Sequence, residues 1–260
     1  MKPRGEKRVD LFVPCLVDHF LPEIGTATCS VLQQAGFSVG YDTRQTCCGQ
    51  PLLNGGYVEE AEPVCRHFLD VFASGSSPLV SPSGSCVSMV RDHYRLIGMD
   101  SEQWGKWEKV NGRIVELAEF LVERRLEGCF AKRMAGKVVV HQSCHFLRHI
   151  GGAEPLTKLL KELDGLEVIE GAESTFCCGF GGVFSVRQPE LSVAMGRRRL
   201  ADCLQYEPDA IVVPDAGCIL QLRQILSAME LSNPPVVVHY AQLLAATSLE
   251  ELVAAGGRSS

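Results

Sequence analysis

The stretch Gln45-Thr46-Cys47-Cys48-Gly49-Gln50-Pro51 contains two adjacent cysteines followed by a glycine, and Cys177-Cys178-Gly179 repeats this pattern 130 residues later. A single cysteine precedes each pair with 31 or 32 residues between them, and another follows each pair with 37 or 39 residues between. This internal period predicts a duplicated module with four thiols in each copy. The corresponding cysteines, 129 to 132 residues apart, are Cys15 and Cys144, Cys47 and Cys177, Cys48 and Cys178, and Cys86 and Cys218.

Composition narrows the class of protein. Of the 260 residues, 46% are hydrophobic, which is enough for two half-size lobes that each bury a core. The formal net charge of −6 argues against nucleic acid or an anionic membrane surface as a partner. The sequence has no apolar run long enough for a membrane span and no signal-peptide pattern, so we expect a cytoplasmic protein.

Twelve cysteines in a reducing compartment need a chemical role. Disulfide frameworks belong to small secreted domains without a sufficient core, and this chain fits neither condition. Metal ligation or redox chemistry is therefore the better interpretation. The four cysteines outside the repeat are expected to be small buried residues of the core, namely Cys29, Cys65, Cys129 and Cys203.

Strands and helices alternate in both halves of the sequence, which predicts an α/β fold of two tandem Rossmann-like lobes with parallel sheets. We expect the lobes to cover residues 1–135 and 136–260. The predicted strands are Val9–Val13, Phe37–Tyr41, Leu79–Ser81, Lys137–His141, Leu166–Ile169 and Ala210–Val213, and the main helices are Pro22–Gln34, Tyr57–Phe72, Glu154–Leu163 and Pro189–Leu204. The segments Val115–Leu121 and Val238–Leu244 close the two halves in similar ways.

Every cysteine of the repeat follows the end of a predicted strand. In open parallel sheets, the loops at the carboxyl ends of the strands form the crevice that binds ligands. We therefore expect each lobe to gather four sulfurs at that edge. Gly49 and Gly179 would permit the sharp turn that adjacent cysteines need to reach one centre.

Four thiolates suit an iron–sulfur cluster, and they also suit zinc. Structural zinc sites usually contain two short C-x₂₋₄-C units, and neither half of this sequence has one. The pattern therefore favours an iron–sulfur centre and electron transfer, while a zinc-stabilised scaffold is the alternative.

The same motifs resemble the duplicated cysteine-rich CCG domain that occurs in heterodisulfide reductase, in the glycolate oxidase iron–sulfur subunit, and in the lactate utilization protein A family. The resemblance to the last family is the strongest and covers essentially the whole chain. It runs through Phe12–Asp18, Gln45–Pro51, Ser83–Cys86, Gln142–Arg148, Cys177–Ser185 and Asp215–Cys218.

This resemblance implies a subunit of an L-lactate-oxidising complex rather than a complete enzyme. The complex would convert lactate to pyruvate, and this subunit would hold iron–sulfur clusters, up to one per lobe, and pass electrons. The implied partners are a ferredoxin-like iron–sulfur subunit and a third subunit. A heterodisulfide-type thiol reductase is the alternative that the other proteins with this domain suggest.

One departure from the family motif concerns the cluster type. The fullest form of the motif ends in C-x₂-C, but Ser83 and Asp215 replace the first cysteine of that ending. Four thiols per site favour an ordinary [4Fe-4S] cluster over a noncubane type, and they argue against disulfide reduction. Asp215 would either ligate an iron or cap the following helix, and we expect the cap.

Three further residues are candidates for a supporting role. His145 stands beside Cys144, where it would either contact a cluster sulfur or be an ordinary loop histidine. Arg148 and Arg187 follow cluster cysteines and would suit a bidentate contact with a lactate carboxylate.

Overall fold

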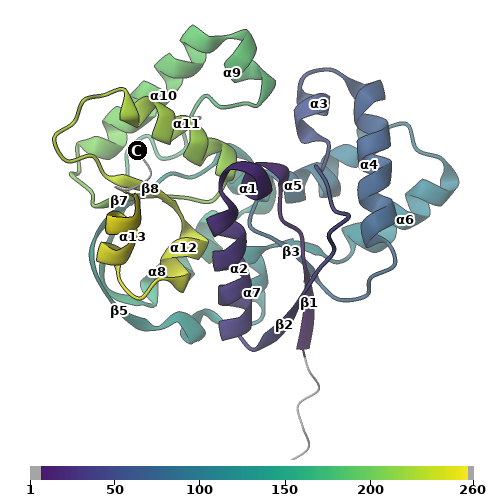
Figure 1. Ribbon diagram of the computed structural model, residues 1–260, viewed down its shortest axis with the longest axis horizontal. Coiled ribbons are helices and arrows are strands. Elements are labelled where there is room, and N and C mark those ends of the chain that lie inside the picture. Colours follow the sequence, from purple (N-terminus) through teal and green to yellow (C-terminus); the bar gives the residue numbers. More distant parts are fainter. Residues whose placement is uncertain (1–6, 257–260) are drawn as a thin grey trace, which may run out of the picture.

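The computed structural model describes residues 7–256, so the first six and the last four residues of the two predicted lobes lie outside the described residues. The chain forms two halves of similar build (Figure 1). The first half contains β1 (Lys7–Leu11), α1 (Cys15–Phe20), α2 (Pro22–Gln34), β2 (Phe37–Tyr41), α3 (Gln50–Asn54), α4 (Val58–Phe72), β3 (Leu79–Ser81), α5 (Gly84–Ser88), the π-helix η1 (Met89–His93), the 3₁₀-helix η2 (Tyr94–Leu96), α6 (Ser101–Asn111), β4 (Ile114–Glu116), α7 (Leu117–Glu123) and the 3₁₀-helix η3 (Glu127–Phe130). The second half contains β5 (Lys132–Val140), the π-helix η4 (Phe146–Ile150), α8 (Ala153–Lys161), β6 (Leu163–Glu170), α9 (Val183–Arg187), α10 (Pro189–Leu204), β7 (Ala210–Val213), α11 (Ala216–Ser227), β8 (Val236–His239), α12 (Tyr240–Ala245) and α13 (Leu249–Gly256).

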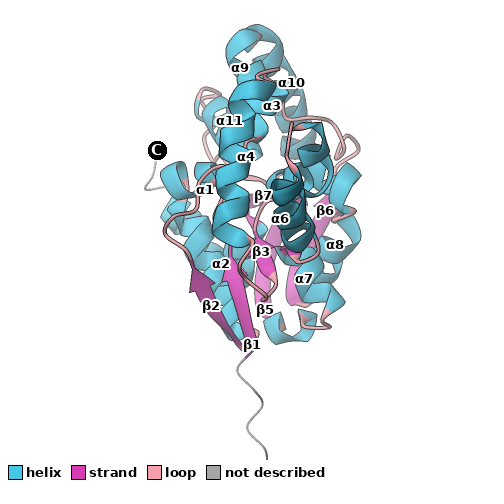
Figure 2. Ribbon diagram, turned by 90° about the vertical axis from the view of Figure 1, so that its right-hand side faces the viewer, coloured by secondary structure: helices cyan, strands magenta, loops and turns pink. Residues whose placement is uncertain are grey.

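Each half contains one four-stranded parallel sheet, and the two sheets have the same strand order. The first is β2-β1-β3-β4 and the second is β6-β5-β7-β8. The registers agree as well, because Phe12 N–H donates to the Val80 carbonyl and His141 N–H donates to the Val212 carbonyl, both at 2.9 Å. Helices flank the strands (Figure 2). The predicted α/β fold of two tandem Rossmann-like lobes is confirmed.

Most predicted elements occur where the sequence placed them. The bounds of α2, β2, β3, α10 and β7 coincide with the prediction. The strands β5 and β6 begin earlier than predicted, at Lys132 and Leu163. The short fourth strands, β4 and β8, overlap the starts of the two similar closing segments, for which no strand was predicted. Among residues 7–256, no helix has both the length and the apolar character that crossing a bilayer requires.

Helices of the two halves pack against each other in a hydrophobic core that both halves share. The helix α12 of the second half packs on α2 of the first (Figure 1), and α7 of the first packs on α8 of the second. Because α7 follows β4 as α12 follows β8, the interface is reciprocal. Val31 of α2 and Leu243 of α12 are fully buried in this shared core. The predicted lobe boundary between residues 135 and 136 stays a prediction.

A buried carboxyl group links the halves. Tyr240 O–H donates to Glu116 Oε1 at 2.5 Å, while the N–H of Ala118 donates to Glu116 Oε2 at 2.7 Å. Burial nevertheless dominates and raises the pKa of Glu116 to about 8. Between pH 4.5 and about 8, the folded protein therefore holds a proton on Glu116 that the unfolded chain has lost.

This proton predicts a pH dependence of stability. Because the folded state binds the extra proton, stability falls as pH rises from 4.5 to about 8, by up to about 1.4 kcal/mol per pH unit. We expect Glu116→Gln to make this slope shallower in urea unfolding of the protein at several pH values. Glu123→Gln, on the exposed end of α7, is the control and should keep the wild-type slope. Identical slopes for all three proteins would show that Glu116 ionises normally.

Candidate metal centre

The fold brings the repeated cysteines to the carboxyl ends of the strands. Cys15 opens α1 just after β1, and Cys144 follows β5 in the same way. Cys86 and Cys218 lie in the first turns of α5 and α11, which follow β3 and β7. The two Cys-Cys-Gly loops follow β2 and β6. Each lobe therefore supplies its four sulfurs from three strand ends, as the parallel topology predicts.

The glycine after each cysteine pair makes the turn. Gly49 and Gly179 have φ values of 87° and 85°, in the left-handed region that favours glycine. In both loops the glycine N–H then donates to the sulfur two residues earlier, Cys47 or Cys177, at 3.4 Å. The two Cys-Cys-Gly turns thus share the same glycine conformation and the same N–H to sulfur bond.

Hydrogen bonds within each quartet stabilise a thiolate. In the first quartet, bonds from the Cys15 and Cys48 thiols lower the pKa of Cys47 to about 3, and the Cys15 and Cys47 sulfurs are 3.5 Å apart. In the second quartet, bonds from Cys144 and Cys178 lower the pKa of Cys177 to about 2. The thiolate is the form of cysteine that binds metals.

The second quartet contains an additional polarised sulfur. Cys178 donates to Cys218 at 3.1 Å, and Ser143 Oγ donates to the same sulfur at 3.4 Å. The bond from Cys178 is the main reason that the pKa of Cys218 falls to about 5 despite its burial.

Both quartets line a single cavity of about 130 Å³. The cysteine repeat predicts two groups of four sulfurs, but a single shared cavity was not expected from the sequence. The helices that carry Cys86 and Cys218 each pack against the other half, on η4 and α1 respectively. The cysteines that line the cavity are Cys15, Cys47, Cys48, Cys86, Cys144, Cys177, Cys178 and Cys218.

Ser83 and Asp215, which replace the fifth cysteines, bond to each other across the two halves. Ser83 Oγ donates to Asp215 Oδ1 at 2.9 Å, and Ser85 N–H donates to the same oxygen at 3.2 Å. The expected cap is therefore wrong for Asp215, whose side chain makes no capping bond to α11. Ser83 is the residue that caps, because its Oγ accepts from Cys86 N–H.

Asp215 is also buried within the cavity wall. Burial, followed by the nearby Cys218 sulfur, raises the pKa of this carboxyl to about 7. Its second oxygen, Oδ2, is buried and has no hydrogen-bond partner among the described residues. This oxygen belongs to a residue that lines the cavity with the sulfurs.

The other three candidates lie in different surroundings. His145 lines the cavity, and its Nδ1 is 3.4 Å from Cys144 Sγ. Burial lowers the pKa of His145, which favours the neutral ring. Arg148 and Arg187 are exposed and are not among the cavity-lining residues. Arg187 instead donates to the Tyr57 hydroxyl at 2.6 Å.

The cysteines outside the repeat differ in burial. Cys65 and Cys203 are fully buried and Cys29 is partly buried, in keeping with the prediction. Cys129 is exposed, so the prediction of a core residue is wrong there. Cys129 lies in the short 3₁₀-helix η3 at the surface, just before β5.

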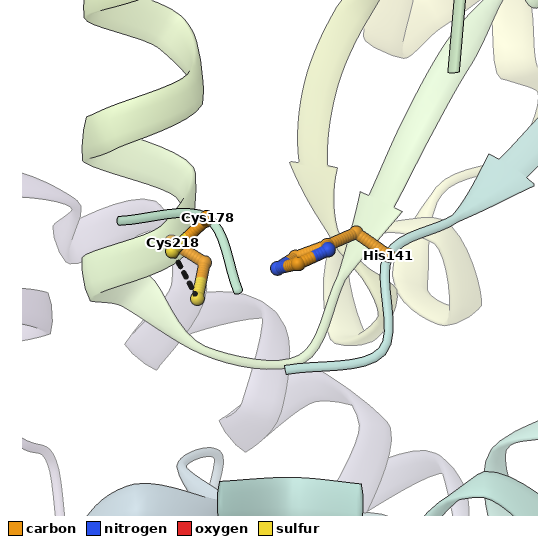
Figure 3. Close-up of side chains that lie close together, drawn as sticks. All are labelled: His141, Cys178 and Cys218. Atoms are coloured by element: carbon orange, nitrogen blue, oxygen red, sulfur yellow. Dashed lines mark hydrogen bonds between the residues drawn. The ribbon is translucent and has the colours of Figure 1, made fainter. Parts of the chain in front are cut away.

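His141 is not among the candidate residues predicted from the sequence, yet it lies at the second quartet. One imidazole nitrogen of His141 and the sulfurs of Cys178 and Cys218 lie within 4.8 Å of one another, and the ring points toward the two sulfurs (Figure 3). His141 is fully buried. The signal available in the sequence was its position at the end of a buried strand, three residues before Cys144.

Comparison with known proteins identifies the two cysteine-rich halves as copies of one domain. Residues 9–91 and 138–223 each match the cysteine-rich domain named CCG. These two stretches define the class, which is a protein with a duplicated cysteine-rich domain.

Curated relatives cover almost the whole chain. "Lactate utilization protein A 1" of Bacillus mycoides is 35% identical over 238 residues, which cover 91% of this chain and 96% of the relative. "Lactate utilization protein A" of Geobacillus kaustophilus is 34% identical, with 91% and 98% covered. The chain belongs to the lactate utilization protein A family.

A solved structure shares the fold. A hypothetical protein from Helicobacter pylori superposes with a TM-score of 0.60 and 12% sequence identity. The match covers 92% of this chain and 48% of that protein, so the chain spans about half of its length. At this level of identity, the similarity concerns the fold alone.

Proposed function

We propose that this protein is the iron–sulfur electron-transfer subunit of an L-lactate-oxidising complex in the cytoplasm. The observation that carries the proposal is the arrangement of eight cysteines, four from each half, around one cavity. The names of the relatives connect the family with lactate utilization. The chain would be a subunit of an oxidoreductase rather than a complete enzyme.

The residues around the cavity fit iron–sulfur clusters. Each quartet offers four sulfurs, which is the usual number of ligands for a [4Fe-4S] cluster. Glycine turns aim backbone N–H groups at Cys47 and Cys177, and such bonds support the charge of a cluster. Up to one cluster per lobe would bind, and each would supply one-electron transfer.

The chemistry of lactate oxidation requires further subunits. Conversion of lactate to pyruvate releases two electrons and two protons. An iron–sulfur cluster carries one electron at a time, so both electrons have to pass on to another protein. We propose a ferredoxin-like iron–sulfur subunit and a third subunit of the lactate utilization complex as partners.

Anaerobic reconstitution with iron and sulfide tests the proposal. We expect up to about eight iron atoms and a matching amount of acid-labile sulfide per chain. The dithionite-reduced protein should show an EPR signal of a reduced cluster. Protein that is folded, retains no sulfide and shows no signal after this treatment would contradict the proposal.

One observation favours zinc as a second candidate. The Cys15 and Cys47 sulfurs are 3.5 Å apart, close to the separation of about 3.8 Å that tetrahedral Zn–S bonds of about 2.3 Å produce. A zinc-stabilised scaffold for the other subunits would then be the function. Metal analysis of protein purified without oxygen separates the two, because zinc without sulfide selects the scaffold.

A further inference from the structure

The two halves differ at the point where the central strand meets its quartet. Phe12 follows β1 and His141 follows β5, each three residues before the first cysteine of its quartet. Their backbone N–H groups make the equivalent bonds to Val80 and Val212, both at 2.9 Å. Phe12 and His141 are therefore structurally equivalent positions with different chemistry.

In the second half, a buried arginine fixes the tautomer of His141. Arg199 Nε donates to His141 Nδ1 at 3.0 Å. A guanidinium group can only donate hydrogen bonds, so Nδ1 is unprotonated and Nε2 carries the hydrogen of the neutral ring. Arg199 is fully buried, and it is held by Asp202 and by the Val140 carbonyl.

The protonated nitrogen is the one that faces the second quartet. The end of the ring remote from the backbone points toward Cys178 and Cys218 (Figure 3). The buried Nε2 atom has no hydrogen-bond partner among the described residues. An N–H group has no free lone pair for a metal, so in this tautomer His141 can donate a hydrogen bond to a sulfur of the second quartet but cannot ligate a metal.

The equivalent positions in the first half carry no such donors. Phe12 replaces His141, and its ring packs on Phe68 and Phe72 of α4 with centroid distances of 4.9 and 5.8 Å. Ser143, which donates to Cys218 in the second half, corresponds to Pro14. The first quartet is thus backed by apolar rings and the second by a polar network.

We infer that the two centres have different reduction potentials and that the second has the higher one. This inference rests on the proposed function, since it requires a cluster at each quartet. Hydrogen bonds to a ligating sulfur stabilise the additional negative charge of the reduced cluster and so raise its potential. With a cluster held by each quartet, this order would favour transfer of one electron from the first centre to the second, with no bond broken and no proton moved.

Redox titration of the reconstituted protein, followed by EPR, tests this order. The variants Cys48→Ser and Cys178→Ser each remove one cysteine from one quartet, and they assign each signal to a lobe. We expect two midpoint potentials in the unmodified protein, with the higher one from the second lobe. Equal potentials, or the opposite order, would overturn the inference.

Substitution of His141 and Ser143 tests whether their hydrogen bonds cause the difference in reduction potential. His141→Phe introduces the residue of the first lobe, and we expect it to lower the reduction equilibrium constant of the second cluster about tenfold, or about 59 mV for one electron. Ser143→Ala is a milder variant that should shift the same potential in the same direction. The first cluster is the internal control and should not change. Unchanged potentials in both variants would contradict the role of these donors.

The tautomer has an independent readout that needs no cluster. In ¹⁵N NMR of histidine-labelled protein, we expect His141 to show an unprotonated Nδ1 and a protonated Nε2, with His141→Phe used for assignment. A protonated Nδ1 would overturn the inference. Absence of any cluster after reconstitution would instead refute the proposed function, so the two failures are distinguishable.

Discussion

Reconstituted Cys178→Ser protein is expected to lose the second cluster and keep the first. Cys178 is almost completely buried, and its sulfur lies 3.1 Å from Cys218, so a serine there removes a central ligand of that quartet. Bound iron and sulfide should fall to about half of the wild-type values. EPR should lose the signal of one lobe only.

Two further variants complete this experiment. Cys48→Ser should give the converse result, with loss of the first cluster alone. Cys203→Ser is the matched control, because Cys203 is also a fully buried cysteine of the second half but does not line the cavity. It should retain both signals. If Cys178→Ser and Cys48→Ser each abolished all cluster binding in folded protein, the eight sulfurs would form one joint centre.

Gly179→Ala is expected to destabilise the protein and to disrupt the second centre. A Cβ atom at this position would lie 2.4 Å from the Ser192 carbonyl oxygen, which belongs to the backbone of α10 and cannot rotate away. The left-handed φ of 85° adds a second penalty for any residue with a side chain. Together they predict a loss of about 3 kcal/mol and displacement of the loop that carries Cys177 and Cys178.

Gly36→Ala separates these two effects. Gly36 has nearly the same φ, 86°, but a Cβ atom there meets no other atom within 4 Å. This control should lose only about 1 kcal/mol and should bind iron normally. Urea unfolding and iron content measure both properties. Equal stability and full iron content in both variants would show that the Ser192 carbonyl does not exclude a side chain at position 179.

The cysteines, the strand ends and the turns of this site could be predicted because each depends on a short stretch of sequence. The repeat of four cysteines predicted the set of candidate ligands, and the alternation of elements placed every quartet at strand ends. Gly49 and Gly179 predicted the turns, which the positive φ values confirm.

The relations between the halves could not be predicted in the same way, because they depend on packing. That Asp215 bonds to Ser83, 132 residues away, depends on how α11 meets α5. The role of His141 depends on Arg199, which lies 58 residues further along and looks in the sequence like part of an exposed run of three arginines. The short strand β4 passes directly into α7, so its three residues leave little periodicity to detect.

The reciprocal packing of α12 on α2 and of α7 on α8 has an evolutionary consequence. A polypeptide with a single copy of the module would leave these apolar faces uncovered, so it would pair with an identical chain around a two-fold axis. In such a homodimer, every substitution alters both cysteine quartets at once. Fusion of two gene copies removes that constraint, and one site can then acquire a histidine while its twin keeps a phenylalanine.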